Sequence, residues 1–242
     1  MFLKKMLHPL NRIRLRFLNR LKWKNTSRIF CISMQRTGTT SVGDFFTYFG
    51  YPVARWDDSK RNKWSGSWFD GDFESIFNSK DFLSFQVFED DPWWYPEFYK
   101  VLYHRFPDAK FILFTRNADD WFRSLKSHSN GKTLGNTKRH CKVYRREQDF
   151  YERLDTDPQF KPKVFEIDNL LNLEGFGDHY KKIYTLRNRE VVDFFEEKSS
   201  GSLFYCDLYD DKKWQKLGAF FNIDVPENFE LHSNKSSSKI KP

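Results

Sequence analysis

The chain has 242 residues and carries 41 Lys and Arg against 33 Asp and Glu, a formal net charge of +8. Nine of the basic side chains and no acid lie within residues 1–28, so the rest of the chain is close to neutral and a surface that binds nucleic acid is not expected. Hydrophobic residues make up 39% and aromatic residues 19%, which excludes a disordered chain and is ample for one aromatic core.

Cysteine spacing and apolar run length indicate the compartment. Cys31, Cys141 and Cys206 are widely spaced and form no Cys-x-x-Cys motif, so we expect neither a disulfide framework nor a metal site. No stretch reaches the roughly 17 to 25 apolar residues that cross a bilayer. Arginines also interrupt the N-terminus, where a signal peptide would be continuously apolar. These features predict a cytoplasmic protein.

Residues 1–27 form a basic N-terminal arm. Apolar residues recur at spacings of three and four between residues 2 and 21, with basic residues mostly between them. This pattern predicts an amphipathic helix, interrupted near Pro9. Such a helix either packs on its own domain or attaches to an anionic membrane surface through residues 1–24. The role of the arm stays open between these two interpretations.

The first α/β unit follows the arm. Residues 28–33 are an apolar run of strand type, and residues 34–41 are a polar loop that contains a glycine. A helix is predicted over residues 42–49, ending at Gly50, and an extended segment over residues 51–53. Strand, loop, helix and strand in this order are typical of the opening of a parallel sheet.

A second unit begins with a strand predicted over residues 82–88. A helix over residues 95–105 leads into residues 110–115, the clearest buried strand of the sequence. Arg116 follows that strand directly. Asn117 is a good helix cap and should begin a helix that runs to about His128.

The remaining elements complete one domain over residues 28–235, followed by a basic tail over residues 236–242. Residues 129–165 read as an insertion with a helix over residues 142–154. A helix over 180–196, a strand over 203–207 and a helix over 212–221 follow. We therefore predict an α/β fold with a doubly wound, mostly parallel sheet flanked by helices. Residues 54–80 and 129–165 are expected as variable loops that shape a substrate pocket.

Two predicted strand ends carry groups suited to phosphate-like anions. Ligands of open parallel sheets bind beyond the carboxyl ends of the strands. After the first strand, Gly38 lets the backbone turn its amides inward, the next helix adds its positive N-terminus, and Arg36 adds charge. The loop is not a Walker A sequence, because Ser33 stands at the first glycine position and Thr39 at the lysine position. A magnesium-dependent nucleotide kinase is therefore disfavoured but remains an alternative.

Arg116 and Ser124 supply the second anion-binding group. Arg116 leaves the end of the strand over residues 110–115, and Ser124 lies about two turns into the following helix. Both side chains can therefore reach one phosphate at the same edge of the sheet.

In the combination of the loop over residues 34–41 with Arg116 and Ser124, the sequence resembles the sulfotransferases that use 3′-phosphoadenosine 5′-phosphosulfate (PAPS). The resemblance covers roughly residues 28–235. It implies a P-loop-like fold, transfer of a sulfuryl group to a hydroxyl or amine, adenosine 3′,5′-bisphosphate as product, and no required metal. The segment that is similar to the family's 5′-phosphosulfate loop is Arg36, Thr37, Gly38, Thr39, Thr40 and Ser41. Arg116 and Ser124 resemble the family's 3′-phosphate pair, and Lys235 is a further candidate for holding donor phosphates.

Further motifs point to the bacterial-type subgroup of this family. Its Asp-x-Pro-Trp element is matched by Asp90-Asp91-Pro92-Trp93. The similarity continues through residues 106–113 and 121–124, and again through residues 214–221 and 232–234. Two departures stand out, because many relatives have lysine in place of Arg36 and a His-Asn pair in place of Arg187-Asn188. The second departure puts an acceptor role at Arg187 in doubt.

The catalytic base has several candidates. Asp90 ends the strand predicted over residues 82–88 and is preferred, whereas Glu89 and Asp91 are immediate rivals. His128, four residues after Ser124 on the same helical face, is another. Arg36 is expected to stabilise charge on the departing phosphate. The base thus stays open among these four groups.

The acceptor is not fixed by the sequence, and carbohydrate, lipid and small metabolite all remain open. Trp93, Trp94 and Tyr95 either stack on an acceptor or belong to the core. A run of basic residues between Lys132 and Arg146 either attracts an acidic glycan or forms a solvated helix face. The expected partners are thus a small-molecule donor and an unknown acceptor. The alternative to an enzyme is a basic protein that binds membranes or nucleic acid without catalytic activity.

Overall fold

The computed structural model describes residues 27–133, 137–157 and 171–231. In chain order the elements are β1 (Ile29–Cys31), α2 (Thr39–Tyr48), β2 (Val53–Ala54), α3 (Trp56–Asn62), α4 (Trp64–Asp70), α5 (Phe73–Phe77), the 3₁₀ helix η1 (Phe82–Ser84), β3 (Val87–Phe88), α6 (Phe98–Arg105), β4 (Lys110–Thr115), α7 (Ala118–Ser129), β5 (Lys132–Thr133), α8 (Thr137–Val143), α9 (Glu147–Thr156), β6 (Leu171–Asn172), α10 (Gly177–Lys198), η2 (Ser200–Ser202), β7 (Leu203–Asp207) and α11 (Lys213–Phe221).

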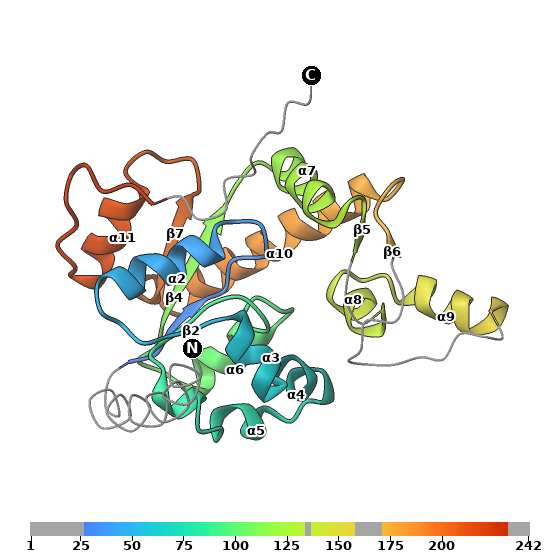
Figure 1. The fold of residues 1–242 in the computed structure, drawn as a ribbon, viewed down its shortest axis with the longest axis horizontal. Helices are drawn as coiled ribbons and strands as arrows, with labels where there is room; N and C mark the ends of the chain where they lie inside the picture. The colour runs from blue at the N-terminus through green and yellow to red at the C-terminus, as the bar shows by residue number, and fades with distance from the viewer. Residues whose placement is uncertain (1–26, 134–136, 158–170, 232–242) are drawn as a thin grey trace, which may run out of the picture.

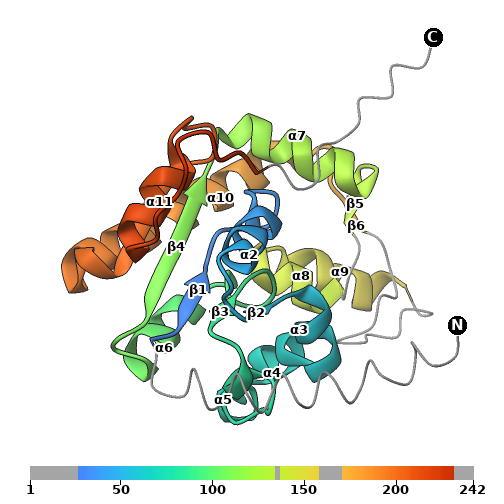
Figure 2. The ribbon, with the colours of Figure 1, turned by 60° about the vertical axis from the view of Figure 1, so that its left-hand side comes forward.

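Five strands form a parallel sheet at the centre of the fold (Figures 1 and 2). Their order is β2-β3-β1-β4-β7, and each neighbouring pair is parallel. The chain leaves β1 toward β2 on one side and leaves β4 toward β7 on the other. A crevice therefore opens between the carboxyl ends of β1 and β4, at the topological switch point. The predicted fold class, a doubly wound α/β sheet flanked by helices, is confirmed.

Helices cover both faces of the sheet, and rings fill the space between. Successive strand residues point to opposite faces, so each face has its own apolar cluster. Phe111 of β4 meets Phe195 of α10 with ring centroids 4.7 Å apart. Phe114, three residues further along β4, faces the opposite side of the sheet. Its ring centroid lies 5.8 Å from that of Trp214 in α11. The predicted aromatic core thus forms two layers around one sheet.

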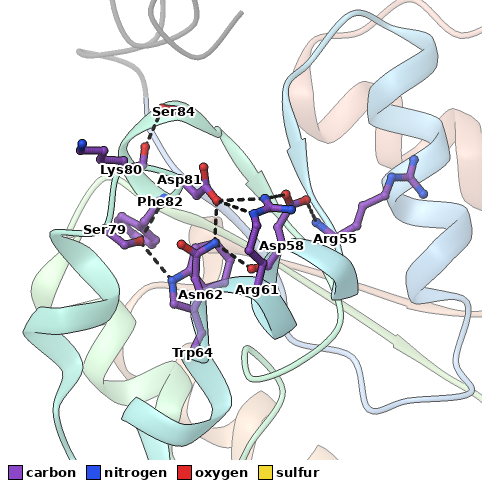
Figure 3. Close-up of polar contacts among 10 residues, drawn as sticks. All are labelled: Arg55, Asp58, Arg61, Asn62, Trp64, Ser79, Lys80, Asp81, Phe82 and Ser84. Atoms are coloured by element: carbon purple, nitrogen blue, oxygen red, sulfur yellow. Dashed lines mark hydrogen bonds and ion pairs between the residues drawn. The ribbon is translucent and has the colours of Figure 1, made fainter. Parts of the chain in front are cut away.

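Residues 54–80 fold into three short helices, α3, α4 and α5, rather than the variable loop expected there. The network in Figure 3 ties α3 and the start of α4 to the segment before β3. Asp81 is 3% exposed and accepts hydrogen bonds from Arg61 Nη2 at 2.9 Å and from Asn62 Nδ2 at 2.6 Å. The indole N–H of Trp64 donates to the hydroxyl of Ser79 over 3.1 Å. These buried polar contacts fix the helices against the sheet.

The strand predicted over residues 82–88 is wrong in its first part, because only Val87–Phe88 pair in the sheet. Residues 82–84 form η1 instead. The hydroxyl of Ser79 accepts the N–H of Phe82 over 3.2 Å, and the hydroxyl of Ser84 donates to the carbonyl of Lys80 over 2.6 Å (Figure 3). Such local side-chain bonds hold a turn in place of a strand ladder.

Helix bounds differ from the predictions at other places too, and the helix predicted over residues 42–49 begins three residues earlier, at Thr39. The helix predicted over residues 95–105 begins at Phe98, because Tyr95 donates its N–H to the carbonyl of Pro92 in a preceding turn at 2.9 Å. The helix predicted over residues 142–154 is split into α8 and α9 at Arg145, whose φ is 54°. The helix predicted over residues 180–196 extends over α10, Gly177–Lys198. The strands predicted over residues 110–115 and 203–207 are confirmed at both ends.

A small antiparallel sheet, β5-β6, joins the end of α7 to the start of α10. Helices α8 and α9 lie beyond it, at the end of the molecule opposite α11 (Figure 1). The basic arm, the tail and residues 158–170 lie outside the described residues, so the arm helix and its membrane contact stay predictions. Among the described helices, none combines the length and apolar character needed to span a bilayer.

Candidate functional site

The loop between β1 and α2 leaves the sheet at the topological switch point between β1 and β4. Gly38 stands immediately before α2 with φ of 83°, a left-handed conformation that favours glycine. A Cβ atom at Gly38 would lie 2.7 Å from Cδ1 of Leu208, in the loop after β7. The backbone angle therefore favours glycine at this position, and any larger residue would also have to displace the end of the Leu208 side chain. The turn directs the N-terminus of α2 toward the crevice, where helix geometry favours an anion.

Three predicted side chains converge beside this helix end. The Nε of Arg36 donates to the hydroxyl of Ser124 in α7 over 3.1 Å. The Nη1 of Arg116 donates to the carbonyl of Arg36 over 3.4 Å. The backbone N–H of Arg116 donates to the hydroxyl of Tyr184 over 2.9 Å, which fixes the residue at the end of β4. The β1–α2 loop, β4 and α7 thus bring Arg36, Arg116 and Ser124 to one place.

The two arginines concentrate positive charge in this place. The pKa of Arg36 is lowered, first because the side chain is partly buried and second because Arg116 is close. The Nε of Arg116 has no hydrogen-bond partner among the described residues. Two neighbouring guanidinium groups with donors to spare suit an anionic ligand.

A cleft of about 600 Å³ contains these groups. Of the predicted residues, it is lined by Arg36, Gly38, Thr39, Thr40, Ser41, Arg116 and Ser124. The lining residues that sequence reasoning missed are Asp120, Arg123, Ser127, Leu208, Tyr209, Asp211, Lys213, Trp214 and Leu231. Several of them follow β7, whose carboxyl end lies on the same rim as those of β1 and β4, so strand order is the signal that points to them.

Of the predicted donor-binding residues that the structure describes, Thr37 does not line the cleft. Thr37 is fully buried, and its hydroxyl donates to the carbonyl of Met34, so it holds the turn together. Lys235 lies outside the described residues. Tyr209, by contrast, contacts Arg116 directly, because its hydroxyl accepts a hydrogen bond from Nη2 of that arginine.

The three acidic residues at the end of β3 have different surroundings. Glu89 is 3% exposed and lies under α2, where its Cγ would be 3.1 Å from a Cβ placed on Gly43. Burial raises the pKa of Glu89 to about 7, although the positive charge of Arg55 opposes the shift. Asp90 has φ of 70°, and its Oδ1 accepts the N–H of Asp91 over 2.9 Å.

Burial also raises the pKa values of Asp90 and Asp91. For Asp90 the shift is large, and the negative charges of Asp91 and Glu89 add to it. For Asp91, the positive charge of Arg139 and a hydrogen bond from Tyr95 oppose the shift only in part. A carboxylate with a raised pKa is a stronger base once it is deprotonated, so both acids suit proton transfer.

A narrow crevice of about 140 Å³ adjoins the loop. Asp91 and His128 both line it, together with Gln35, the residue before Arg36, whereas Asp90 is not among its lining residues. The pKa of His128 is lowered by burial and by the charge of Arg36, which keeps the imidazole neutral and able to accept a proton. The crevice therefore brings two of the four base candidates to the loop that carries Arg36.

The aromatic residues after these acids belong to the core. Trp93, Trp94 and Tyr95 are 0%, 4% and 2% exposed, so the core interpretation is confirmed, although Trp94 and Tyr95 also border the crevice. Cys31 is fully buried beneath the loop, and burial raises its thiol pKa to about 12, in agreement with inert packing.

One family model matches the chain, that of the sulfotransferase domain, over residues 28–238. No curated protein matches the chain at a significant level.

Proposed function

The chain belongs to the sulfotransferase domain family, and we propose that it transfers a sulfuryl group from PAPS to a hydroxyl or amine group of an acceptor. The observation that carries this proposal is the convergence of Arg36, Arg116 and Ser124 beside the N-terminus of α2. These are the groups that recognition of a nucleotide with two separate anionic ends requires.

The cleft is a good fit for such a donor. Its volume of about 600 Å³ lies within the range of nucleotide-sized ligand sites. Arg116, with its unpartnered Nε, and Ser124 suit a 3′-phosphate. Arg36 and the start of α2 suit the 5′ end. An anion between the two guanidinium groups would also relieve their mutual repulsion.

Bound PAPS supplies the sulfuryl group and a 5′-phosphate that receives negative charge when the group leaves. Arg36 is assigned to stabilise that charge, an effect on the order of 100- to 1000-fold per well-placed donor. The hydrogen bond to Ser124 holds the Arg36 side chain over the loop. Gly38 keeps the N-terminus of α2 directed at the same place.

A base must accept the proton of the attacking hydroxyl or amine. Asp90 remains the first candidate, supported by its raised pKa and its position at the carboxyl end of β3. Asp91 and His128 are the rivals that line the crevice, whereas Glu89 is directed under α2. A well-placed base contributes roughly 100- to 10,000-fold.

Nucleotide binding measured by calorimetry tests the proposal. Adenosine 3′,5′-bisphosphate should bind without magnesium and more tightly than magnesium-ATP, and labelled PAPS should transfer sulfate to members of an acceptor panel. Preference for magnesium-ATP would indicate a kinase instead. A chain that lacks residues 1–25 should keep its donor affinity, whereas a protein that binds polyanions through the arm would lose its salt-dependent binding.

A further inference from the structure

A second, larger cavity lies apart from the donor cleft. Its volume is about 790 Å³, and it shares no lining residue with the cleft. Helices α4, α6, α8 and α10 contribute its walls. Much of the wall is apolar, with Trp68, Trp94 and Phe98 among its buried rings. A cavity of this size and lining suits a ligand with an apolar or aromatic body.

One buried charge faces this apolar wall. Arg187 of α10 lines the cavity and is 5% exposed. Its Nη2 donates to the carbonyl of Trp94 over 3.1 Å, but Nε and Nη1 have no hydrogen-bond partner among the described residues. Burial lowers the pKa of Arg187 to about 10, so the group remains a cation at neutral pH. A buried cation with unused donors is costly unless an anion accompanies it.

The other charged residues of the cavity lie at its rim and include partners for one another. Arg145 pairs with Glu190 at 3.2 Å, and Lys100 pairs with Glu97 at 3.0 Å. These rim pairs are largely solvated and close to neutral as a set. Within the described lining, Arg187 is thus the buried charge, and no carboxylate there forms an ion pair with it, although Glu190, one turn further along α10, acts on it from beyond ion-pair distance.

The cavity is a neighbour of the narrow crevice that contains two base candidates. Trp94 and Val143 line both the cavity and the narrow crevice that contains Asp91 and His128. Met34 lines the cavity as well, two residues before Arg36. A ligand in the cavity would therefore lie next to the base candidates and the anion-binding loop.

We propose that this cavity binds the acceptor, and that the acceptor is amphipathic, with an apolar or aromatic body and a compact anionic group such as a carboxylate or sulfonate that pairs with Arg187. The inference rests on the proposed sulfuryl transfer for the role of the cavity. The proposal narrows the acceptor class to organic acids that carry a hydroxyl or amino group. Arg187, which stands where many relatives have histidine, then determines acceptor specificity.

A matched pair of fluorescent probes tests the recognition without any turnover. The anionic probe is 8-anilinonaphthalene-1-sulfonate, and the neutral one is N-phenyl-1-naphthylamine, which has the same aromatic body without the sulfonate. Both are titrated with adenosine 3′,5′-bisphosphate present at saturation to block the donor cleft. The wild-type protein should prefer the anionic probe by about tenfold or more, as expected for a charge-assisted bond in a buried site.

The variant Arg187→Met should lose this preference while it keeps its affinity for the neutral probe. Arg189→Met, an exposed arginine on the same helix, is the matched control and should retain the preference. Equal binding of the two probes by the wild type, or an unchanged preference in Arg187→Met, overturns the proposal. A purely structural role for Arg187 would instead weaken both probes equally.

Two further measurements keep the outcomes separate. If Arg187→Met does not fold, competition in the wild type decides, because 12-hydroxydodecanoate should displace the anionic probe better than dodecane-1,12-diol does. Equal displacement by the two competitors counts against the anion site. If adenosine 3′,5′-bisphosphate fails to bind, the proposed function fails, and the same probe titration without nucleotide still tests the cavity.

Discussion

The Nε of Arg36 donates a hydrogen bond to the hydroxyl of Ser124 across 3.1 Å, which joins the loop after β1 to the second turn of α7. The two residues are 88 positions apart in the chain. Their contact shows that the two predicted anion-binding segments form one site in the folded protein. It also places the charge of Arg36 close to that of Arg116.

Replacement of Arg36 should affect turnover more than donor binding. We expect Arg36→Ala to lower kcat by about 100- to 1000-fold, because charge on the leaving phosphate loses its stabilising donor. Affinity for adenosine 3′,5′-bisphosphate should fall much less, whereas Arg116→Ala should mainly weaken that affinity. Steady-state kinetics and calorimetry measure the two effects. Arg105→Ala, at the exposed end of α6, is the control, and equal loss of kcat and affinity in Arg36→Ala would contradict the assigned role.

The close approach of Gly38 to Leu208 predicts a steric effect. Gly38→Ala should lower both thermal stability and nucleotide affinity, because a Cβ there meets Leu208 at 2.7 Å in addition to the strain of a φ of 83°. Gly50→Ala is a matched control, since Gly50 has φ of 81° and no atom within 4 Å of its Cβ position. The control should show only the backbone cost, roughly 1 to 2 kcal/mol. If the two variants behave alike, or if adding Leu208→Ala recovers nothing, the contact is unimportant.

The base assignment predicts separate pH profiles. Asp90→Asn should reduce kcat by roughly 100- to 10,000-fold if Asp90 is the base. Because burial and neighbouring acids raise its pKa, the rate of the wild type should rise with pH as the carboxyl group deprotonates. Asp91→Asn and His128→Asn, measured in the same way, test the rivals. An Asp90→Asn protein with normal kcat and an unchanged pH profile removes Asp90 from the mechanism.

Glu89 should make the fold less stable as the pH rises. Its folded pKa of about 7 lies above the ordinary value of 4.5, because burial disfavours the charged form. Between these values the folded protein holds a proton that the unfolded chain has lost, so stability falls as pH increases through this window. Glu89→Gln should therefore gain stability at pH 8, by up to about 3 kcal/mol, and little below the window.

Thermal unfolding at pH 4 and pH 8 measures this difference. Glu196→Gln, at an exposed position of α10, should show no comparable gain. An equal effect of Glu89→Gln at both pH values would mean that the carboxyl group is not protonated by its burial.

The sequence allowed two things to be predicted for physical reasons, namely the long strands and the placement of Arg36, Arg116 and Ser124 at one edge of the sheet. The runs that became β4 and β7 are short and apolar and are bounded by turn residues, so their ends were recognisable. Arg116 follows β4 directly, and its place in the site follows from strand order. Helical spacing placed Ser124 at the same edge as Arg116, but the hydrogen bond that Ser124 accepts from Arg36 was not predicted.

The missed features depend on contacts between distant residues. Helices α3 to α5 are five to seven residues long, too short for a clear helical period, and α3 is held by Asp81 from the segment that follows them. The lining of the cleft by Leu208 and Tyr209 depends on where β7 pairs, which local sequence does not contain. The environment of Arg187 likewise arises only when α10 packs against the turn at Trp94.

Because Leu208 packs on Gly38, the cleft is completed only after the chain beyond β7 has folded against the loop. One wall of the donor cleft comes from Leu208, Tyr209 and Trp214, near the C-terminal end of the described chain. During synthesis residues 34–41 emerge long before that wall, so a chain that ends before β7 lacks one side of the cleft. Nucleotide that binds only the finished cleft would then stabilise the docking of β7 and α11 by mass action. Binding of such a nucleotide would thus report that the last strand has joined the sheet.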